Sequence, residues 1–232
     1  PFGELFSDAV AFGLPPGARL AIIIYFGNTS PSVTGHPGSR TTSYITKGDG
    51  TSSPGVTGAI RTDHWYVISG VDVLADSKTF AVAALGNSIT DGRGSGTNKQ
   101  NRWTDILSER LLNNASTQSV GVLNLGIGGN CVLKGGLGPT ALERFERDIL
   151  SQHNVKWVIL LEGINDIGNI KTAAAAPGVA RELIDAYSWM VDKAHATGIK
   201  VYGCSILPFG SSFYDAPFRQ GARAGASQWI RS

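Results

Sequence analysis

The sequence lacks a long apolar run and any cluster of charge of one sign. No apolar stretch reaches the roughly 18 residues that a membrane-spanning helix needs, and the longest run, residues 20–26, has the length of a strand. The 20 basic and 18 acidic residues are scattered along 232 positions, giving a formal net charge of +2. Nucleic acids and membrane surfaces are bound through clustered Lys and Arg, so neither is expected as the main partner.

Cysteine is scarce, and histidines with other metal ligands at suitable spacing are missing. Cys131 and Cys204 are the only cysteines. Their spacing leaves a disulfide open, but each adjoins an apolar strand-like segment, so we expect two free buried thiols. His36 and His64 have no carboxylate or cysteine at ligand spacing, so surface or edge-strand histidines are expected there, and no metal.

The sequence begins at Pro1 and shows no signal-peptide pattern, which indicates a removed leader or a start inside a longer protein. Glycosylation sequons begin at Asn28 and Asn114. We therefore expect a secreted or extracellular glycoprotein.

The chain has two parts with different sequence patterns. In residues 1–78, short runs of β-branched, aromatic and aliphatic residues (20–26, 41–45 and 65–68) alternate with turn-forming stretches. This pattern predicts a β-rich, sandwich-like accessory segment.

Residues 79–232 alternate between strand and helix patterns. A capping box at Thr140 and Glu143 begins one helix, and Gly198 ends a long helix over residues 179–194. Continuously apolar strands separated by helices form a parallel sheet covered on both faces, so we expect a three-layer α/β/α, flavodoxin-like domain. Its strands are predicted at 80–85, 120–125, 157–161 and 200–206, with a further helix around the apolar stripe of 103–111.

In such sheets, ligands bind beyond the carboxyl ends of the strands. Ser88 follows the first strand, a glycine-rich turn at 126–130 follows the second, and Asn165 follows the third. Each feature alone is an ordinary turn or helix start. Together they place a hydroxyl, backbone N–H groups and a carboxamide at one edge, as acyl transfer requires.

These residues resemble the short sequence motifs, or blocks, of a known family. Residues 86–89 (Gly-Asn-Ser-Ile) resemble its Gly-Asp-Ser-Leu block, residues 124–130 its second block with the glycine at Gly129, and residues 163–166 match its Gly-x-Asn-Asp block. The sequence thus resembles the SGNH/GDSL hydrolases, particularly carbohydrate-esterase-like members with an N-terminal β domain.

The resemblance implies a function and a site. Ser88 would be the nucleophile, and the N–H groups of Ser88 and Gly129 with the side chain of Asn165 would form the oxyanion hole. The implied substrate is a small-molecule or glycan ester of a small acyl group such as acetyl, with no metal or organic cofactor. Asn87 departs from the usual Asp, which affects local hydrogen bonding more than activity.

The family's fourth block, Asp-x-x-His near the C-terminus, is the largest departure. Residues 192–195 match it literally, but they end the helix that leads into the fourth strand, at the opposite edge of the sheet from Ser88. We expect His195 to be a solvated residue at a helix end. The catalytic histidine is therefore predicted outside this sequence, on a complementary C-terminal segment or chain, which makes 79–232 an incomplete domain.

Two other classes of function compete. An inactive SGNH relative that binds carbohydrate would explain a missing base, but intact Ser88, Gly129 and Asn165 argue against it. A flavodoxin-like nucleotide binder would need a phosphate-cradling loop, and the turn after the first strand lacks the Gly-Lys-Ser/Thr ending.

Overall fold

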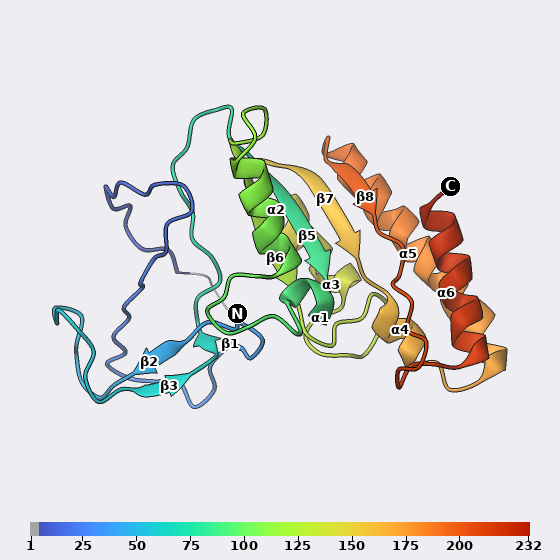
Figure 1. The fold of residues 1–232 in the computed structure, drawn as a ribbon, viewed down its shortest axis with the longest axis horizontal. Helices are drawn as coiled ribbons and strands as arrows, with labels where there is room; N and C mark the ends of the chain where they lie inside the picture. Colours follow the sequence, from blue (N-terminus) through green and yellow to red (C-terminus); the bar gives the residue numbers. More distant parts are fainter. Residues whose placement is uncertain (1–4) are drawn as a thin grey trace.

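A computed structural model describes residues 5–232, and its centre is a four-stranded parallel sheet (Figure 1). The strand order is β6-β5-β7-β8, so the first strand of the domain lies between the second and third. The predicted parallel sheet is confirmed; its last strand is shorter than predicted because the chain leaves β7 after Cys204. The strands are β5 (Phe80–Gly86), β6 (Val120–Gly126), β7 (Val155–Leu161) and β8 (Lys200–Gly203).

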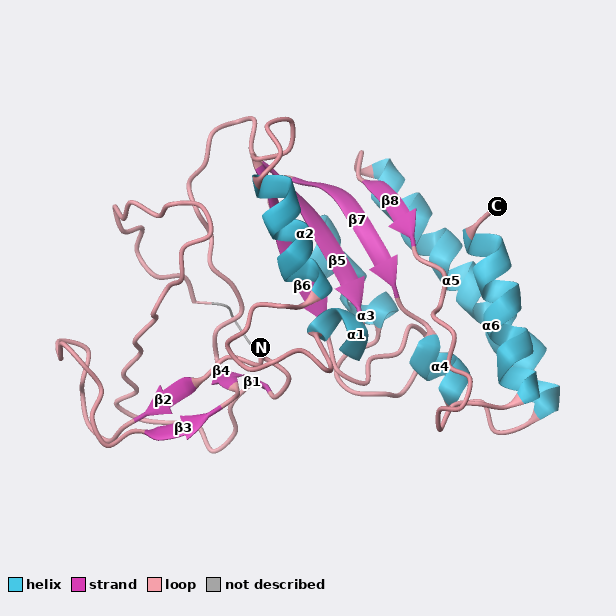
Figure 2. Ribbon diagram, in the orientation of Figure 1, coloured by secondary structure: helices cyan, strands magenta, loops and turns pink. Residues whose placement is uncertain are grey.

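Helices cover both faces of the sheet (Figure 2). On one face α2 (Trp103–Leu112) packs on β6. The other face carries α3 (Ala141–Phe145), which continues into the π-helical turn η1 (Glu146–Leu150), together with α5 (Ala176–Ala196) and α6 (Pro217–Ile230). The predicted three layers are thus present. Three short elements complete the domain: α1 (Ser88–Asp91), α4 (Ile164–Gly168) and the 3-10 turn η2 (Ala173–Ala175).

The core lies between the sheet and α3, α5 and α6. Leu85 of β5 and Val158 of β7 are fully buried against side chains that include Phe145, Leu183 and Met190. Each such side chain contributes about 1.5–3 kcal/mol through burial. The core therefore holds β5 and β7 rigidly, and with them the loops that follow.

The predicted helix ends are confirmed. Thr140 Oγ1 accepts from the N–H of Glu143, whose carboxylate accepts from the N–H of Thr140. After α5, Gly198 has a φ of 77°, the left-handed conformation that ends helices without a Cβ clash.

The N-terminal segment is β-rich but smaller than a sandwich. In it β1 (Gly35–His36) pairs with β4 (Trp65–Tyr66), and β2 (Ser43–Ile45) pairs with β3 (Ile60–Thr62), both antiparallel. The strand predicted at 20–26 is wrong: these residues form no strand, and the large apolar side chains there are 44–56 % exposed. An apolar run becomes a strand only when a neighbour satisfies its backbone groups, and no segment pairs with this one in the described chain.

No helix within residues 5–232 is both long and apolar enough to span a bilayer.

Candidate active site

The carboxyl ends of β5, β6 and β7 meet at one rim of the sheet, where the arrowheads point toward α1 and α4 (Figure 1). Gly86 is the last residue of β5, and it pairs with Gly126 of β6 and Leu161 of β7. The segments that carry Ser88, Gly129 and Asn165 therefore leave the sheet at the same level. The structure brings the three predicted site segments together.

Ser88 begins the four-residue helix α1 and is half-buried. The side-chain oxygen of Asn87 caps this helix by accepting from the N–H of Ile89 at 3.0 Å. Glycine is required just before it, because a Cβ at Gly86 would lie 2.1 Å from Thr90 Oγ1. The turn is thus tight and presents Ser88 at the N-terminal end of a helix, where backbone N–H groups point outward.

The departure at Asn87 has a structural explanation. Its Nδ2 donates to Glu162 Oε2 at 2.9 Å, and both side chains are buried. An ionised aspartate has no proton to donate and would set a second carboxylate against Glu162. The asparagine therefore suits the buried glutamate that follows β7.

Burial raises the pKa of Glu162 to about 8, against the opposing effects of its hydrogen bonds from Asn87 and the N–H of Gly163. Its Oε2 accepts both bonds. Its Oε1 is buried and has no hydrogen-bond partner within the described chain. This carboxyl group directly follows the last residue of β7, at the rim, and has a high proton affinity.

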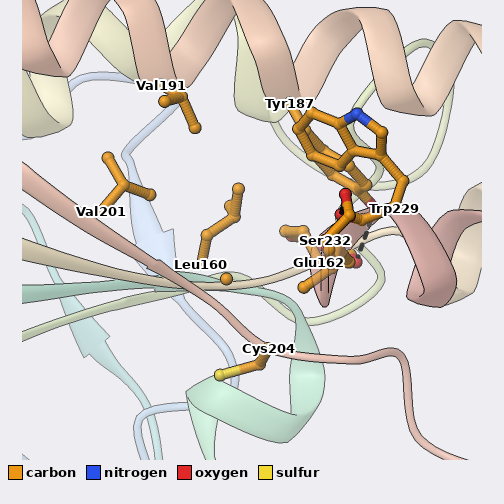
Figure 3. A pocket seen from close by; sticks show the side chains of 10 residues that line it. Leu160, Glu162, Tyr187, Val191, Val201, Cys204, Trp229 and Ser232 are labelled. Atoms are coloured by element: carbon orange, nitrogen blue, oxygen red, sulfur yellow. Dashed lines mark hydrogen bonds between the residues drawn. The ribbon is translucent and has the colours of Figure 1, made fainter.

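Glu162 lines a cavity of about 280 Å³ between the sheet and the helices α5 and α6 (Figure 3). Apolar and aromatic side chains form most of its wall, including Leu160, Tyr187 and Trp229. Neither Ser88 nor Asn165 lines it. This cavity lies behind the rim and is not the place where Ser88 would meet a substrate.

The glycine-rich turn after β6 is fixed by a buried network. Gly129 has a φ of 72°, and a Cβ there would lie 3.1 Å from the side chain of Leu137. Asn130 is fully buried and donates from Nδ2 to the carbonyl groups of Leu137 and Pro139. The turn is thus rigid, as a preorganised backbone donor requires.

Arg144, which the sequence analysis missed, ties this turn to β5. It is 1 % exposed and donates to the carbonyl groups of Leu125 and Gly86 and to Oδ1 of Asn130. Its Nη1 forms an ion pair with Oδ2 of Asp148 at 3.0 Å. The only signal in the sequence is an arginine beside Phe145, inside the apolar stripe of a helix.

Asn165 lies in α4 and contacts the same turn. Its Nδ2 donates to the carbonyl of Asn130 at 2.6 Å, and its Oδ1 accepts from the hydroxyl of Tyr214 at 2.6 Å. Tyr214 follows β8, in a loop for which the sequence predicted no role. Two partners thus fix the orientation of the amide, and Nδ2 keeps a second hydrogen for another acceptor.

Asp166 and Cys131 complete the contact between α4 and the turn. The Asp166 carboxylate accepts from the N–H groups of Val132 and Leu133, each at 2.9 Å, and burial raises its pKa. Burial, together with the nearby acidic groups, raises the pKa of the Cys131 thiol to about 12. Cys131 is a free buried thiol, whereas Cys204 is free and only half-buried.

The four histidines lie at different places, and none in the described chain is hydrogen-bonded to Ser88. His195 is in the last turn of α5, which leads to the amino end of β8, and His153 lies two residues before the start of β7. Both therefore lie toward the edge of the sheet away from Ser88. His64 contacts the carbonyl of Pro37, and His36 contacts Asp91.

Comparison with known proteins identifies the family. The model of the GDSL-like lipase/acylhydrolase family matches residues 84–232, more than half of the chain. The chain belongs to this family. The resemblance inferred from the three blocks is confirmed, and the protein is a GDSL-type acylhydrolase.

Several solved structures are similar to this chain, and one that matches with a TM-score of 0.50 has the same fold. A variant of the esterase AlinE4, itself described as an SGNH-hydrolase family esterase, is 16% identical with a TM-score of 0.50 over 67% of this chain and 72% of its own. An acetyl xylan esterase, AlAXEase, is 23% identical (TM-score 0.48; 66% and 71% covered). The esterase EstA from Pseudoalteromonas sp., in a structure inhibited by monoethylphosphonate, is 16% identical (TM-score 0.48; 65% and 72% covered). No curated protein sequence matches the chain.

Proposed function

We propose that this GDSL hydrolase removes a small acyl group, such as acetyl, from a carbohydrate ester through an acyl-enzyme on Ser88. The observation that carries the proposal is the position of Ser88. It begins a helix at the carboxyl end of β5, between the turn with Gly129 and the helix with Asn165. A nucleophile between two rigid donor segments suits the tetrahedral intermediate of acyl transfer.

The oxyanion hole would consist of the N–H groups of Ser88 and Gly129 and Nδ2 of Asn165. The hydrogen bonds of Asn165 to Asn130 and Tyr214 support this role, because they orient the amide before substrate arrives. Donors fixed in advance need no reorganisation when charge develops on the carbonyl oxygen. The chemistry proposed here needs no metal or organic cofactor.

The general base would be a histidine outside these 232 residues, because none of the four present follows the carboxyl end of a strand of the parallel sheet. A complementary segment or chain would supply it. Within residues 5–232, β8 pairs only with β7, and its Tyr202 is 55 % exposed. A strand added to this open edge would bring the residues that follow it to the rim that carries Ser88.

The carbohydrate part of the proposal depends on two observations. One structure with a similar fold is described as an acetyl xylan esterase. The N-terminal segment also presents Trp65 and Tyr66, which are 36 % and 38 % exposed, on the strand paired with His36. Secretion and glycosylation agree with a glycan substrate and stay predictions.

Labelling and hydrolysis test the proposal on protein expressed from its full reading frame. We expect a fluorophosphonate to modify the peptide that contains Ser88, and acetylated xylo-oligosaccharides to be deacetylated. Ser88→Ala should lose both reactions and keep its fold by circular dichroism. Labelling elsewhere would refute the nucleophile, whereas glycan binding without hydrolysis would favour the inactive carbohydrate-binding relative.

A further inference from the structure

The N-terminal segment reaches the helix that begins with Ser88. His36 of β1 contacts Asp91 through Nε2 and Oδ1 at 2.6 Å, across 55 positions of sequence. The Asp91 side chain is 4 % exposed and that of His36 is 34 % exposed. Because an ionised carboxylate can only accept, Nε2 of His36 is the donor.

Asp91 lies where three segments meet. It is the last residue of α1, and its N–H donates to the carbonyl of Asn87 at 2.8 Å. A Cβ at Gly38 would lie 2.1 Å from its Oδ2, and a Cβ at Gly128 would lie 3.3 Å away. The carboxyl group therefore occupies a space that a Cβ at position 38 would fill and that a Cβ at position 128 would crowd.

A displacement of Asp91 would also displace Ser88, because the helix has a single turn. The carbonyl of Ser88 accepts from the N–H groups of Gly92 and Arg93 at 3.0 and 2.7 Å. The backbone N of Asp91 lies 2.1 Å from a Cβ built at Gly126, so α1 also abuts the end of β6. Asp91 thus connects the nucleophile helix to the donor turn.

Further contacts hold the segment of His36 in place. Arg40 Nε donates to the carbonyl of Gly92, and Arg102 donates from Nη2 to the carbonyl of Ser39. The same Arg102 donates from Nε to the carbonyl of Asp91 at 3.1 Å. Trp65 packs edge-on against the His36 ring, with centroids 5.3 Å apart.

We propose that His36 is a positioning residue for the nucleophile. Its hydrogen bond to Asp91 fixes α1 and hence the direction of the Ser88 side chain, so the N-terminal segment is part of the frame of the active site. This inference rests on the proposed role of Ser88. His36 acts through Asp91 and exchanges no proton with the substrate.

Two substitutions of His36 test the role. His36→Ala removes the donor, whereas His36→Gln keeps an N–H at about the position of Nε2. We expect Ala to lower kcat for ester hydrolysis by roughly 10- to 100-fold, as a small misplacement of a reacting group does, with KM nearly unchanged. Gln should restore most of the loss, and the control His64→Ala should match the wild type.

Hydrogen exchange supplies a readout that does not depend on turnover. The amides of Gly92 and Arg93 should exchange faster in His36→Ala than in the wild type and in His36→Gln. Equal exchange in all three proteins would overturn the proposal, whether or not the wild type hydrolyses an ester. A wild type that hydrolyses no ester would by itself refute only the proposed function.

A second outcome would also overturn it. If Gln is as inactive as Ala and the acidic limb of the kcat/KM pH profile disappears in both, His36 is itself the general base. Unchanged kcat in His36→Ala would show that the contact does not position Ser88.

Discussion

Glu162→Gln is expected to make the protein more stable at alkaline pH. The buried carboxyl group has a pKa of about 8 in the folded protein, against an ordinary glutamate pKa of 4.5. Between pH 4.5 and about pH 8, Glu162 is therefore protonated in the folded state and ionised in the unfolded state. The contribution of protonated Glu162 to the free energy of unfolding is fully present below pH 4.5 and is lost as the pH rises through 8. Glutamine keeps the shape, and its carbonyl oxygen still accepts from Asn87 and Gly163.

The magnitude follows from the two pKa values. Each pKa unit of difference corresponds to about 1.4 kcal/mol, so the free energy of unfolding should fall by about 1.4 kcal/mol per pH unit between the two pKa values. Summed over the interval from 4.5 to about 8, the loss is on the order of 5 kcal/mol. That loss is comparable to the whole stability of many domains.

Urea unfolding at pH 5, 6, 7, 8 and 9 measures the effect. The wild type should lose stability as the pH rises, and the difference between Glu162→Gln and the wild type should grow up to about pH 8 and then level off. Glu182→Gln, on the exposed side of α5, is the matched control and should follow the wild type. Parallel curves for Glu162→Gln and the wild type would refute the reasoning.

Three further substitutions concern the rim and its surroundings. Asn165→Ala should lower kcat by about a hundredfold with little change in KM in p-nitrophenyl acetate hydrolysis, because an oxyanion donor acts on charge found only in the transition state; a change confined to KM would contradict this role. Tyr214→Phe removes the hydroxyl that orients Asn165 and should lower kcat by roughly tenfold, the equivalent of one hydrogen bond; an unchanged kcat would mean that Asn130 alone holds the amide. His195→Gln should retain most activity in the same assay, since α5 ends at the far edge of the sheet, and inactivity would revive the Asp-x-x-His match at 192–195.

The parallel domain was predictable because its signals are local. The predicted strands of the sheet are mostly apolar runs, and the capping box at Thr140 and the glycine at 198 mark helix ends by their own backbone chemistry. The site segments followed from topology, since parallel strands place their carboxyl ends at one rim. Ser88, Gly129 and Asn165 could thus be assigned to one edge without any measured distance.

The supporting residues were not predictable because they act through distant partners. Arg144, in the helix after β6, donates to carbonyl groups of β5 and β6, and Tyr214 donates to Asn165 across 49 positions of sequence. A polar residue on an apolar helix face or in a loop has no local pattern that names its partner. The sequence suggested no role for Glu162, and only its burial beside Asn87 reveals its high pKa.

The N-terminal segment shows where local pattern misleads. The apolar run at 20–26 is the strongest strand signal before residue 79, yet it stays unpaired, while His36, interpreted as a surface or edge-strand histidine, contacts the nucleophile helix. Strand formation depends on a partner that satisfies backbone groups, which apolarity alone does not provide. The contact of His36 depends instead on glycines at 38 and 128, whose missing side chains leave room for the carboxylate of Asp91. Space left by small residues on two separate segments becomes visible only when the segments are in place, so the joint between the N-terminal segment and the site had to be found in the structure.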